Sequence, residues 1–340
     1  MQKNNKIQKK ELFFLTSLFV FFIFLSYKFS FVPLNNTENK LTYIATFIKN
    51  GGIPYKEISD NTPPFNYYIY LIAYKIFDMQ PENGNLRFFT LIYVLFFILL
   101  IYMISRLMGG AAVAMLSSFF YVVFIYKNYY SGIYALPGLF CQFPLFLSLM
   151  FLIFIEKDYE KVDYFLSGFF LCVASYFVFS IKFIVFISAV YIYLQWKKRG
   201  DKVKYVIWFL SGFLFMDLLA LLWAAKNSML EKFFQSYFVY NFLSFFNGTN
   251  IIKNLKELFA FNYYLFFILI FIYGFYKSFF VKKINYNSLL FLISSVICII
   301  ALFQKSMNTG YYYLIVPFIS LMLSLFLKDF IFLILKKKNK

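Results

Sequence analysis

Apolar runs of membrane-spanning length follow one another along most of this chain. The hydrocarbon core of a bilayer is about 30 Å thick, and roughly 20 apolar residues in a helix cross it. Of the 340 residues, 62% are hydrophobic and 25% are aromatic. The sequence therefore predicts an all-α polytopic membrane protein with about ten transmembrane helices. The expected spans are 12–27, 88–105, 110–126, 139–155, 164–180, 181–196, 205–224, 258–276, 287–303 and 311–335.

The basic residues predict how these spans are oriented. The formal net charge is +18, and most Lys and Arg residues fall in short segments between apolar runs. Short cytoplasmic loops carry such an excess, whereas long loops are translocated largely regardless of charge. We therefore expect a multi-pass protein of a bacterial inner membrane with both termini cytoplasmic. The two long loops, 28–87 and 225–257, then lie outside, and no soluble basic domain remains to bind nucleic acid.

The residue types that are absent exclude much chemistry. The chain has no histidine, so a histidine base, a catalytic triad and a His-ligated metal are excluded. Its cysteines, Cys141, Cys172 and Cys298, lie inside apolar runs and are expected to be small buried hydrophobes. We expect neither a metal nor a cofactor.

The first outer loop is predicted to contain two short interfacial helices. Leu41, Ile44, Phe47 and Ile48 recur at helical spacing, which predicts an amphipathic helix on the membrane surface. Asn36 or Thr37 can cap this helix, and Asn50-Gly51-Gly52 can end it. The apolar segment from Phe65 to Phe77 is too short to cross a bilayer, so it is expected to be a second interfacial or re-entrant helix.

A polar, turn-rich segment between these two helices carries the first candidate site. Tyr55, Lys56 and Glu57 lie in it, followed by Asp60. Glu57, Asp60 and Glu38 are the only carboxylates between the first span and the second short helix. A carboxylate in this position could take a proton from an acceptor. The alternatives are structural: an acid in the first helical turn favours the helix dipole, and Asp60 can form a turn.

Two charged residues fall within apolar spans. Lys182 is expected near the outer end of one span and Asp217 in the outer half of the next. A charge in a transmembrane helix costs roughly 2.5–3.5 kcal/mol on insertion scales, so such residues are functional candidates. Lys182 could bind a phosphate. Alternatively it extends to the interface, or Lys182 and Asp217 form a structural pair.

The second outer loop is rich in aromatic side chains interleaved with polar ones. Tyr240 and Asn241 end its aromatic run, and Tyr311 begins another at the start of the last span. Such residues suit stacking on a sugar, and they also suit the aromatic belt found at membrane interfaces.

Several short motifs, in order, resemble those of bacterial GT-C membrane glycosyltransferases, which are related to protein O-mannosyltransferases and the lipid A aminoarabinose transferase. The segment Gly51-Gly52-Ile53-Pro54-Tyr55-Lys56-Glu57, followed by Asp60-Asn61-Thr62-Pro63-Pro64, is similar to the family signature. The weaker matches are Arg87, Arg106 with Gly109, Ser167-Gly168 followed by Lys182, Phe238-Val239-Tyr240-Asn241, and Gly310-Tyr311 to Pro317.

The resemblance implies inverting transfer of a sugar from a polyprenyl-phosphate donor to a lipid, glycan or protein acceptor at the outer face. An acid in the first outer loop is the base; we assign Glu38, with Asp60 as the alternative. The expected substrate-binding residues are Tyr55, Lys56, Glu57, Lys182, Tyr240, Asn241 and Tyr311.

The chain departs from the family pattern at four points. Thr37-Glu38 stands where the family has Asp-Glu, Thr62 replaces a lysine, and Gly310 replaces a histidine. The fourth departure concerns the domains: many relatives have a soluble C-terminal domain, whereas we expect residues 1–340 to form a single transmembrane domain.

Two other functions fit a chain of this kind. A degenerate relative could bind lipid-linked sugar as a scaffold without transferring it. The second alternative is a flippase or transporter for polyprenyl-linked glycan. Transporters are typically built from inverted repeats and broken helices, and neither is detectable in this sequence.

Overall fold

The computed structural model describes residues 8–27, 32–76, 83–127, 134–158, 161–195, 202–246, 290, 292–297 and 309–338. Within these ranges the chain is helical apart from turns and one isolated bridge between Pro54 and Ile58. The elements are α1 (Lys9–Tyr27), α2 (Asn36–Lys49), α3 (Phe65–Ile76), α4 (Asn83–Gly109), α5 (Ala111–Lys127), α6 (Pro137–Asp158), α7 (Lys161–Ser175), the 3-10 helix η1 (Phe179–Phe183), α8 (Ile184–Gln195), α9 (Lys202–Lys226), α10 (Leu230–Phe233), the π-helix η2 (Phe234–Val239), α11 (Tyr240–Phe246) and α15 (Thr309–Lys338).

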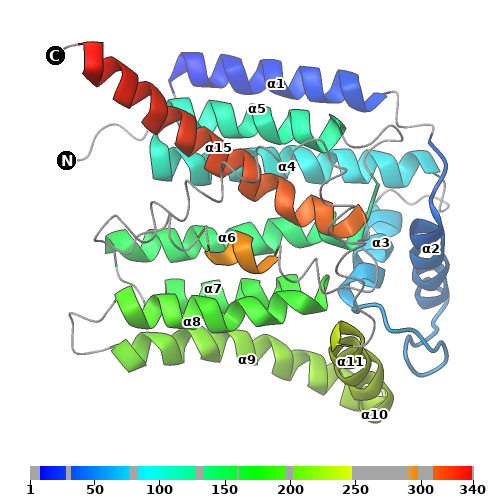
Figure 1. Ribbon diagram of the computed structural model, residues 1–340. Coiled ribbons are helices and arrows are strands. Elements are labelled where there is room, and N and C mark those ends of the chain that lie inside the picture. The colour runs from blue at the N-terminus through cyan, green and yellow to red at the C-terminus, as the bar shows by residue number, and fades with distance from the viewer. Residues whose placement is uncertain are drawn as a thin grey trace.

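The long helices run back and forth in one bundle (Figure 1). One group contains α1, α4, α5 and α15, and the other contains α6, α7, α8 and α9. Helix α6 joins the groups because it packs on α4 and α15 as well as on α7. The short elements α2, α3, α10 and α11 gather at one end, which we call the site end. Helix α1 begins and α15 finishes at the opposite end, which we call the termini end.

Four described helices are long and apolar enough to cross a membrane: Lys9–Tyr27, Asn85–Gly109, Val203–Lys226 and Tyr313–Ile331. Shorter apolar helices cover Ala111–Tyr126, Pro137–Ile153 and Phe179–Leu194. The described residues therefore confirm a helical architecture with four helices that could cross a membrane, while the count of about ten spans stays a prediction. The expected span 258–276 lies outside the described residues, and only Leu290 and residues 292–297 of the span 287–303 are described.

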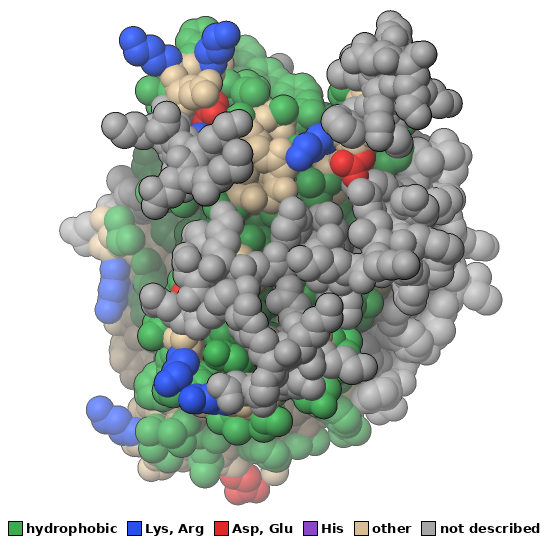
Figure 2. Space-filling view, turned by 90° about the vertical axis from the view of Figure 1, so that its left-hand side faces the viewer, with side chains coloured by type: hydrophobic (Ala, Val, Ile, Leu, Met, Phe, Trp, Pro, Cys, Tyr) green, Lys and Arg blue, Asp and Glu red, His purple; other side chains and the backbone are tan. Residues whose placement is uncertain are grey.

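Lysine and arginine side chains surround the termini end of the bundle (Figure 2). Lys9, Lys10, Lys161, Lys204 and Lys328 are exposed. This is the distribution from which we predicted a cytoplasmic location for both termini.

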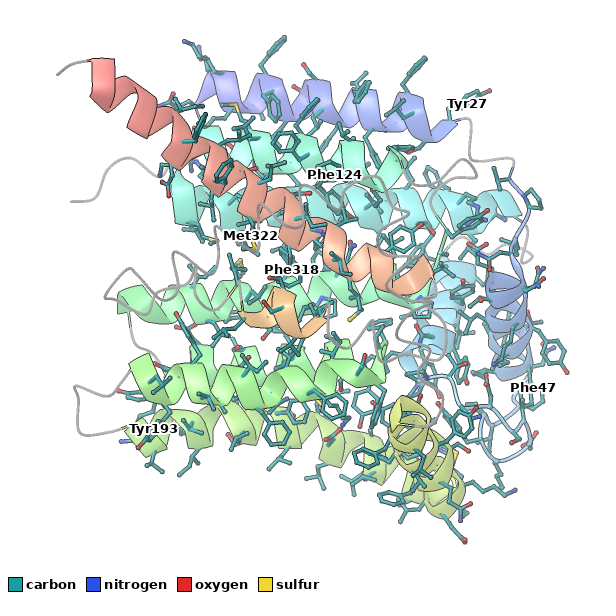
Figure 3. The ribbon with its side chains drawn as sticks, in the orientation of Figure 1. Tyr27, Phe47, Phe124, Tyr193, Phe318 and Met322 are labelled. Carbon is teal, nitrogen blue, oxygen red and sulfur yellow. The ribbon has the colours of Figure 1, made fainter. Side chains whose placement is uncertain are left out.

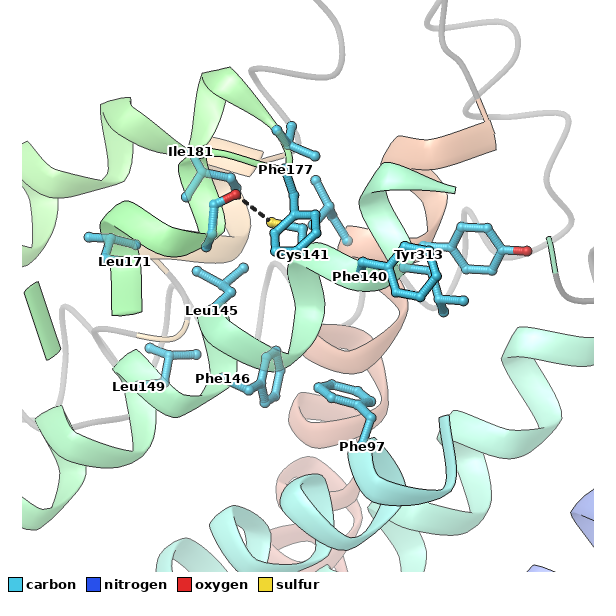
Figure 4. Packing of buried hydrophobic residues seen from close by; sticks show 14 of the residues in the cluster. Phe97, Phe140, Cys141, Leu145, Phe146, Leu149, Leu171, Phe177, Ile181 and Tyr313 are labelled. Carbon is cyan, nitrogen blue, oxygen red and sulfur yellow. Dashed lines mark hydrogen bonds between the residues drawn. The ribbon is translucent and has the colours of Figure 1, made fainter. Parts of the chain in front are cut away.

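Aromatic rings fill the centre of the bundle, where α4, α6 and α15 meet (Figures 3 and 4). The Phe146 ring lies 5.2 Å from Phe97 and 5.0 Å from Phe318, centroid to centroid. Beside them the buried Cys141 thiol donates to the Ala174 carbonyl oxygen at 3.3 Å (Figure 4). Cys141 and Cys172 are free and buried, as predicted, and Cys298 lies outside the described residues.

Helices α7 and α9 approach each other closely because glycines face across their interface. A Cβ atom on Gly168 would lie 1.9 Å from the Phe209 carbonyl oxygen, and one on Gly212 would lie 1.9 Å from that of Phe165. Small residues permit such backbone contact between membrane helices. This contact matters for the site, because α7 leads directly to Lys182 and α9 carries Asp217.

We predict that Gly168→Ala and Gly212→Ala each destabilise the protein. Overpacking costs about 1–3 kcal/mol. We expect this cost to exceed the gain of about 1 kcal/mol that alanine brings to a helix relative to glycine. Thermal unfolding of the purified chain in detergent measures the change. Ser211→Ala is the control, since Ser211 is next to Gly212 and its hydroxyl bonds within its own helix, to the Trp208 carbonyl. An unchanged or higher melting temperature in both glycine variants would contradict the prediction.

Candidate functional site

Helix α2 has defined signals at both of its ends. The Asn35 side chain accepts from the Glu38 amide at 2.9 Å, and Glu38 Oε2 accepts from the Asn35 amide at 2.9 Å, which forms a capping box. The cap is thus Asn35, one residue before the expected Asn36. At the other end Gly51, at φ 92°, and Gly52 return their amides to Ile48 and Phe47, a Schellman ending. Both short helices of the first loop are present, and their seating on a membrane surface stays a prediction.

Glu38 is completely buried and forms an ion pair with Arg87, at the start of α4. Arg87 donates through both terminal nitrogens, with Nη2 2.8 Å from Glu38 Oε2. Glu38 Oε1 also accepts from the Ala135 amide at 2.7 Å. Both carboxylate oxygens are therefore engaged by partners from other parts of the chain.

The same cluster joins the two short helices of the first loop to α4 and to residues 134–136. Arg87 Nη2 lies 3.3 Å from the Pro33 carbonyl oxygen, and the guanidinium lies 5.1 Å from the Tyr134 ring centroid. The Tyr70 hydroxyl of α3 donates to the Ala135 carbonyl at 2.5 Å. Glu38 thus holds α2, α3, α4 and residues 134–136 together.

We predict that Glu38→Gln lowers stability and membrane abundance. Removing one partner of a buried ion pair leaves the other charge uncompensated and costs about 3–5 kcal/mol. Thermal unfolding in detergent and the yield of folded protein measure the effect. The double variant Glu38→Leu/Arg87→Met removes both charges and should recover much of the loss. Glu57→Gln is the matched control because Glu57 is exposed. A Glu38→Gln variant as stable as this control would show that the pair is not structural.

The segment between α2 and α3 is organised by Asp60. Its Oδ1 accepts from Lys40 Nζ at 2.5 Å, the Asn61 amide at 2.7 Å and the Thr62 hydroxyl at 3.2 Å. Its Oδ2 accepts from the Tyr67 hydroxyl at 2.8 Å. Asp60 is 7% exposed and Lys40 is 51% exposed, so the pair sits at the surface of the site end.

Burial alone would raise the pKa of the Asp60 carboxyl. Hydrogen bonds from Lys40 and Tyr67, the Lys40 charge and the Asn61 amide outweigh that burial and hold the pKa below its usual range. Burial, with Tyr55 and Asp60 nearby, raises the pKa of Tyr67, so Tyr67 stays a neutral donor. Asp60 is therefore ionised at neutral pH and held by four partners.

The lowered pKa predicts how this turn responds to acid. The stabilisation from Asp60 is fully present above the unfolded-state pKa of about 3.9. It is lost as pH falls through the lower folded-state pKa. The difference in melting temperature between the parent and Asp60→Asn should be constant above about pH 5 and shrink below about pH 4. A difference that shrinks between neutral pH and pH 5 would indicate that Asp60 is not held in its ionised form.

Lys182 lies on the 3-10 helix η1 and forms an ion pair with Asp217 of α9. The Nζ–Oδ1 and Nζ–Oδ2 distances are 2.6 and 2.9 Å. The Tyr176 hydroxyl also donates to Asp217 Oδ1, at 2.7 Å. Aromatic rings surround the ammonium, with centroids 4.8–5.7 Å from Nζ: Phe238, Phe213, Tyr176 and Tyr237. The Lys182–Asp217 pair considered from the sequence is present.

A row of buried aromatic rings connects the Asp60 turn to Lys182. The Tyr55 ring lies 6.0 Å from Tyr67 and 5.4 Å from Phe233, and Phe233 stacks on Tyr237 at 5.4 Å. Tyr55 has a left-handed backbone, at φ 66°, and a ring that is 3% exposed. The two candidate regions therefore share one packed aromatic wall at the site end.

The segment 230–246 docks on the first loop through polar contacts as well. The Asn241 side-chain Nδ2 donates to the Asn61 carbonyl oxygen at 3.0 Å. Lys232 Nζ donates to the Lys56 carbonyl oxygen at 3.1 Å. Tyr240 is 53% exposed. Asn241 thus connects the segment 230–246 to the first loop.

The sequence-predicted residues fall into separate groups. Tyr55 and Asp60 lie together in the turn, whereas Glu38 lies in its own buried cluster with Arg87. Lys56 and Glu57 are exposed on the turn. Tyr311 falls in α15, and its side chain lies outside the described residues.

Sequence reasoning missed the partners of these groups. It did not identify Lys40 as the partner of Asp60, Arg87 as the partner of Glu38, or the role of Tyr176. Arg87 was noted as a motif match but was not assigned to Glu38. Glu38 and Lys40 are two residues apart on one helix and so lie on different faces, which indicates that they have different partners. Within the described ranges, no group of three or more acidic or cysteine side chains is placed to hold a metal ion.

No protein-family model and no curated protein sequence matches the chain. Two crystal structures resemble it along nearly its whole length. ArnT from Cupriavidus metallidurans bound to undecaprenyl phosphate matches with a TM-score of 0.65 at 12% identity, over 94% of this chain. The Archaeoglobus fulgidus oligosaccharyltransferase in the apo form matches with a TM-score of 0.52 at 12% identity, over 96% of this chain. The chain has a GT-C-like fold.

The chain spans 60% of the ArnT chain and 52% of the oligosaccharyltransferase chain. The match of the fold to these two structures confirms, at the level of the fold, the family resemblance drawn from the motif Gly51–Pro64.

Proposed function

We propose that this protein binds a polyprenyl-phosphate-linked sugar at the outer face of a membrane and transfers the sugar to an acceptor. The observation that carries the proposal is the aromatic wall that joins an ionised carboxylate, Asp60, to a lysine, Lys182. A cation that binds the donor phosphate and a carboxylate that accepts a proton are groups such a transfer needs, and the buried rings hold the two at one end of the bundle. ArnT, which shares the fold, is bound to undecaprenyl phosphate in its crystal structure.

In this proposal Lys182 binds the phosphate of the donor. Its ammonium lies at the site end, where α7 and α9 finish and the short elements gather. A cation there stabilises the charge that develops on the phosphate as the glycosidic bond breaks. The expected orientation, with the site end facing outside, follows from the basic residues at the termini end.

Asp60 is the better candidate for the base than Glu38. Glu38 is fully buried, and Arg87 and two backbone amides engage its oxygens. Asp60 is also paired, but its partner Lys40 is half-exposed. An acceptor hydroxyl that displaces Lys40 from Oδ1 would reach an ionised carboxylate, the form that a general base needs.

A second function is favoured by one observation. Glu38 and Asp60 are both already paired, and Thr37 stands where the family has an aspartate. The chain would then bind lipid-linked sugar without transferring it.

We predict that Asp60→Asn lowers transfer by about 10²–10⁴-fold, the contribution typical of a general base, and leaves donor binding intact. The assay follows radiolabelled sugar from polyprenyl phosphate to acceptor in proteoliposomes that contain the full chain. Lys182→Met should weaken donor binding itself. Asp163→Asn, at the termini end of α7, is the matched control.

The same assay separates the two functions. Donor binding that depends on Lys182, with no transfer by the parent protein, would favour the binding function. Transfer that persists in Asp60→Asn would exclude Asp60 as the base.

A further inference from the structure

The ammonium of Lys182 already has an anionic partner from the protein itself. Asp217 contacts it through both oxygens, at 2.6 and 2.9 Å, in the geometry with which a phosphate would bind a lysine. We propose that Asp217 competes with the lipid phosphate for Lys182, and so selects the singly charged donor and promotes release of the more highly charged product. This inference rests on the proposed function, since it concerns the lysine assigned to the donor phosphate.

The position of the pair permits such an exchange. The side chains of Lys182 and Asp217 are 15% and 17% exposed, so neither is sealed in the core. Phe238, whose ring centroid lies 4.8 Å from the ammonium, belongs to the π-helix η2. A π-helix within a helical segment frequently marks a functional site.

The outer side of the segment 230–246 is apolar and exposed. Leu230, Phe234, Phe242 and Leu243 are each 46–51% exposed, while Phe233 and Tyr237 on its other side are buried against the site. A polyprenyl chain could therefore lie along the outside of this segment while its phosphate reaches the pair beneath it.

The charges explain the selectivity. Lys182 and Asp217 together carry no net charge. The donor is a phosphodiester with one negative charge, whereas the product is a monoester with about 1.5 to 2 negative charges at neutral pH. Asp217 repels the product more than the donor, because like-charge repulsion grows with the charge of the ligand. Without Asp217, the product would remain bound to a lysine that has no other anionic partner among the residues that the structure describes.

Tyr176 supports the carboxylate. Its hydroxyl donates to Asp217 Oδ1 at 2.7 Å, and its ring stacks on Tyr237. The bond holds Oδ1 beside the lysine. Loss of this hydroxyl should weaken Asp217 as a competitor and leave both rings in place.

Binding of polyprenyl phosphate and of a polyprenyl phosphodiester to the purified full chain in detergent tests the proposal. We expect Asp217→Asn to bind the phosphate about tenfold or more tightly than the parent, since a competing charge-assisted hydrogen bond is lost. The gain for the phosphodiester should be smaller. Tyr176→Phe should tighten binding of the phosphate by a lesser factor, and it decides the question if Asp217→Asn does not fold. Tyr193→Phe is the matched control, because Tyr193 lies near the termini end of α8.

The outcomes separate this inference from the function on which it rests. Binding that depends on Lys182 but is unchanged or weaker in folded Asp217→Asn and in Tyr176→Phe would overturn the competition and leave the proposed function standing. Equal gains for the two ligands would overturn the selectivity. No binding by the parent or by any variant would overturn both proposals.

Discussion

The arrangement of the site end depends on one buried ion pair, Glu38 with Arg87. A charge pair removed from water is stable only when its remaining hydrogen-bonding capacity is satisfied. Here the Asn35 and Ala135 amides complete the shell of the carboxylate. These partners fix the start of α2 against α4 and residues 134–136. Because Lys40 lies one turn or less along α2 from Glu38, the same pair sets where Lys40 meets Asp60. The surface ion pair is thus positioned by the buried one.

The two candidate regions differ in how they hold charge. At Asp60 donors from four residues converge, so the buried carboxylate is kept ionised. At Lys182 a single carboxylate and aromatic faces surround the ammonium, so the neutral pair can be held close to lipid at a moderate cost. Between them the rings of Tyr55, Phe233 and Tyr237 provide contact without charge. In the proposed function, phosphate binding at Lys182 and proton transfer at Asp60 would therefore be separated in space along one aromatic wall.

The sequence predicted several long helices, but it predicted neither the break after α7 at Ser175, nor the short helices of 230–246, nor the partners of the charges. Apolar runs predicted α4, α6 and α9 to within a few residues, because lipid requires long uninterrupted helices. Asn50-Gly51-Gly52 correctly predicted the end of α2, since a left-handed glycine closes a Schellman motif. Which cation meets Glu38 depends on the tertiary fold, as Arg87 is 49 residues away. The Lys182–Asp217 pair was one of the alternatives considered from the sequence, because an unpaired charge in a span is costly.

The buried state of Glu38 indicates that this carboxylate has a structural role, whatever the chemistry of the site end. A carboxylate that holds four segments together is retained for structural reasons, whatever happens to catalysis. The residue beside it, Thr37, is exposed and carries no such constraint. A change at position 37 therefore need not disturb the packing of the first loop. In the function proposed above, the base is instead Asp60, which is buried beneath the half-exposed Lys40 and lies beside the aromatic wall that leads to Lys182.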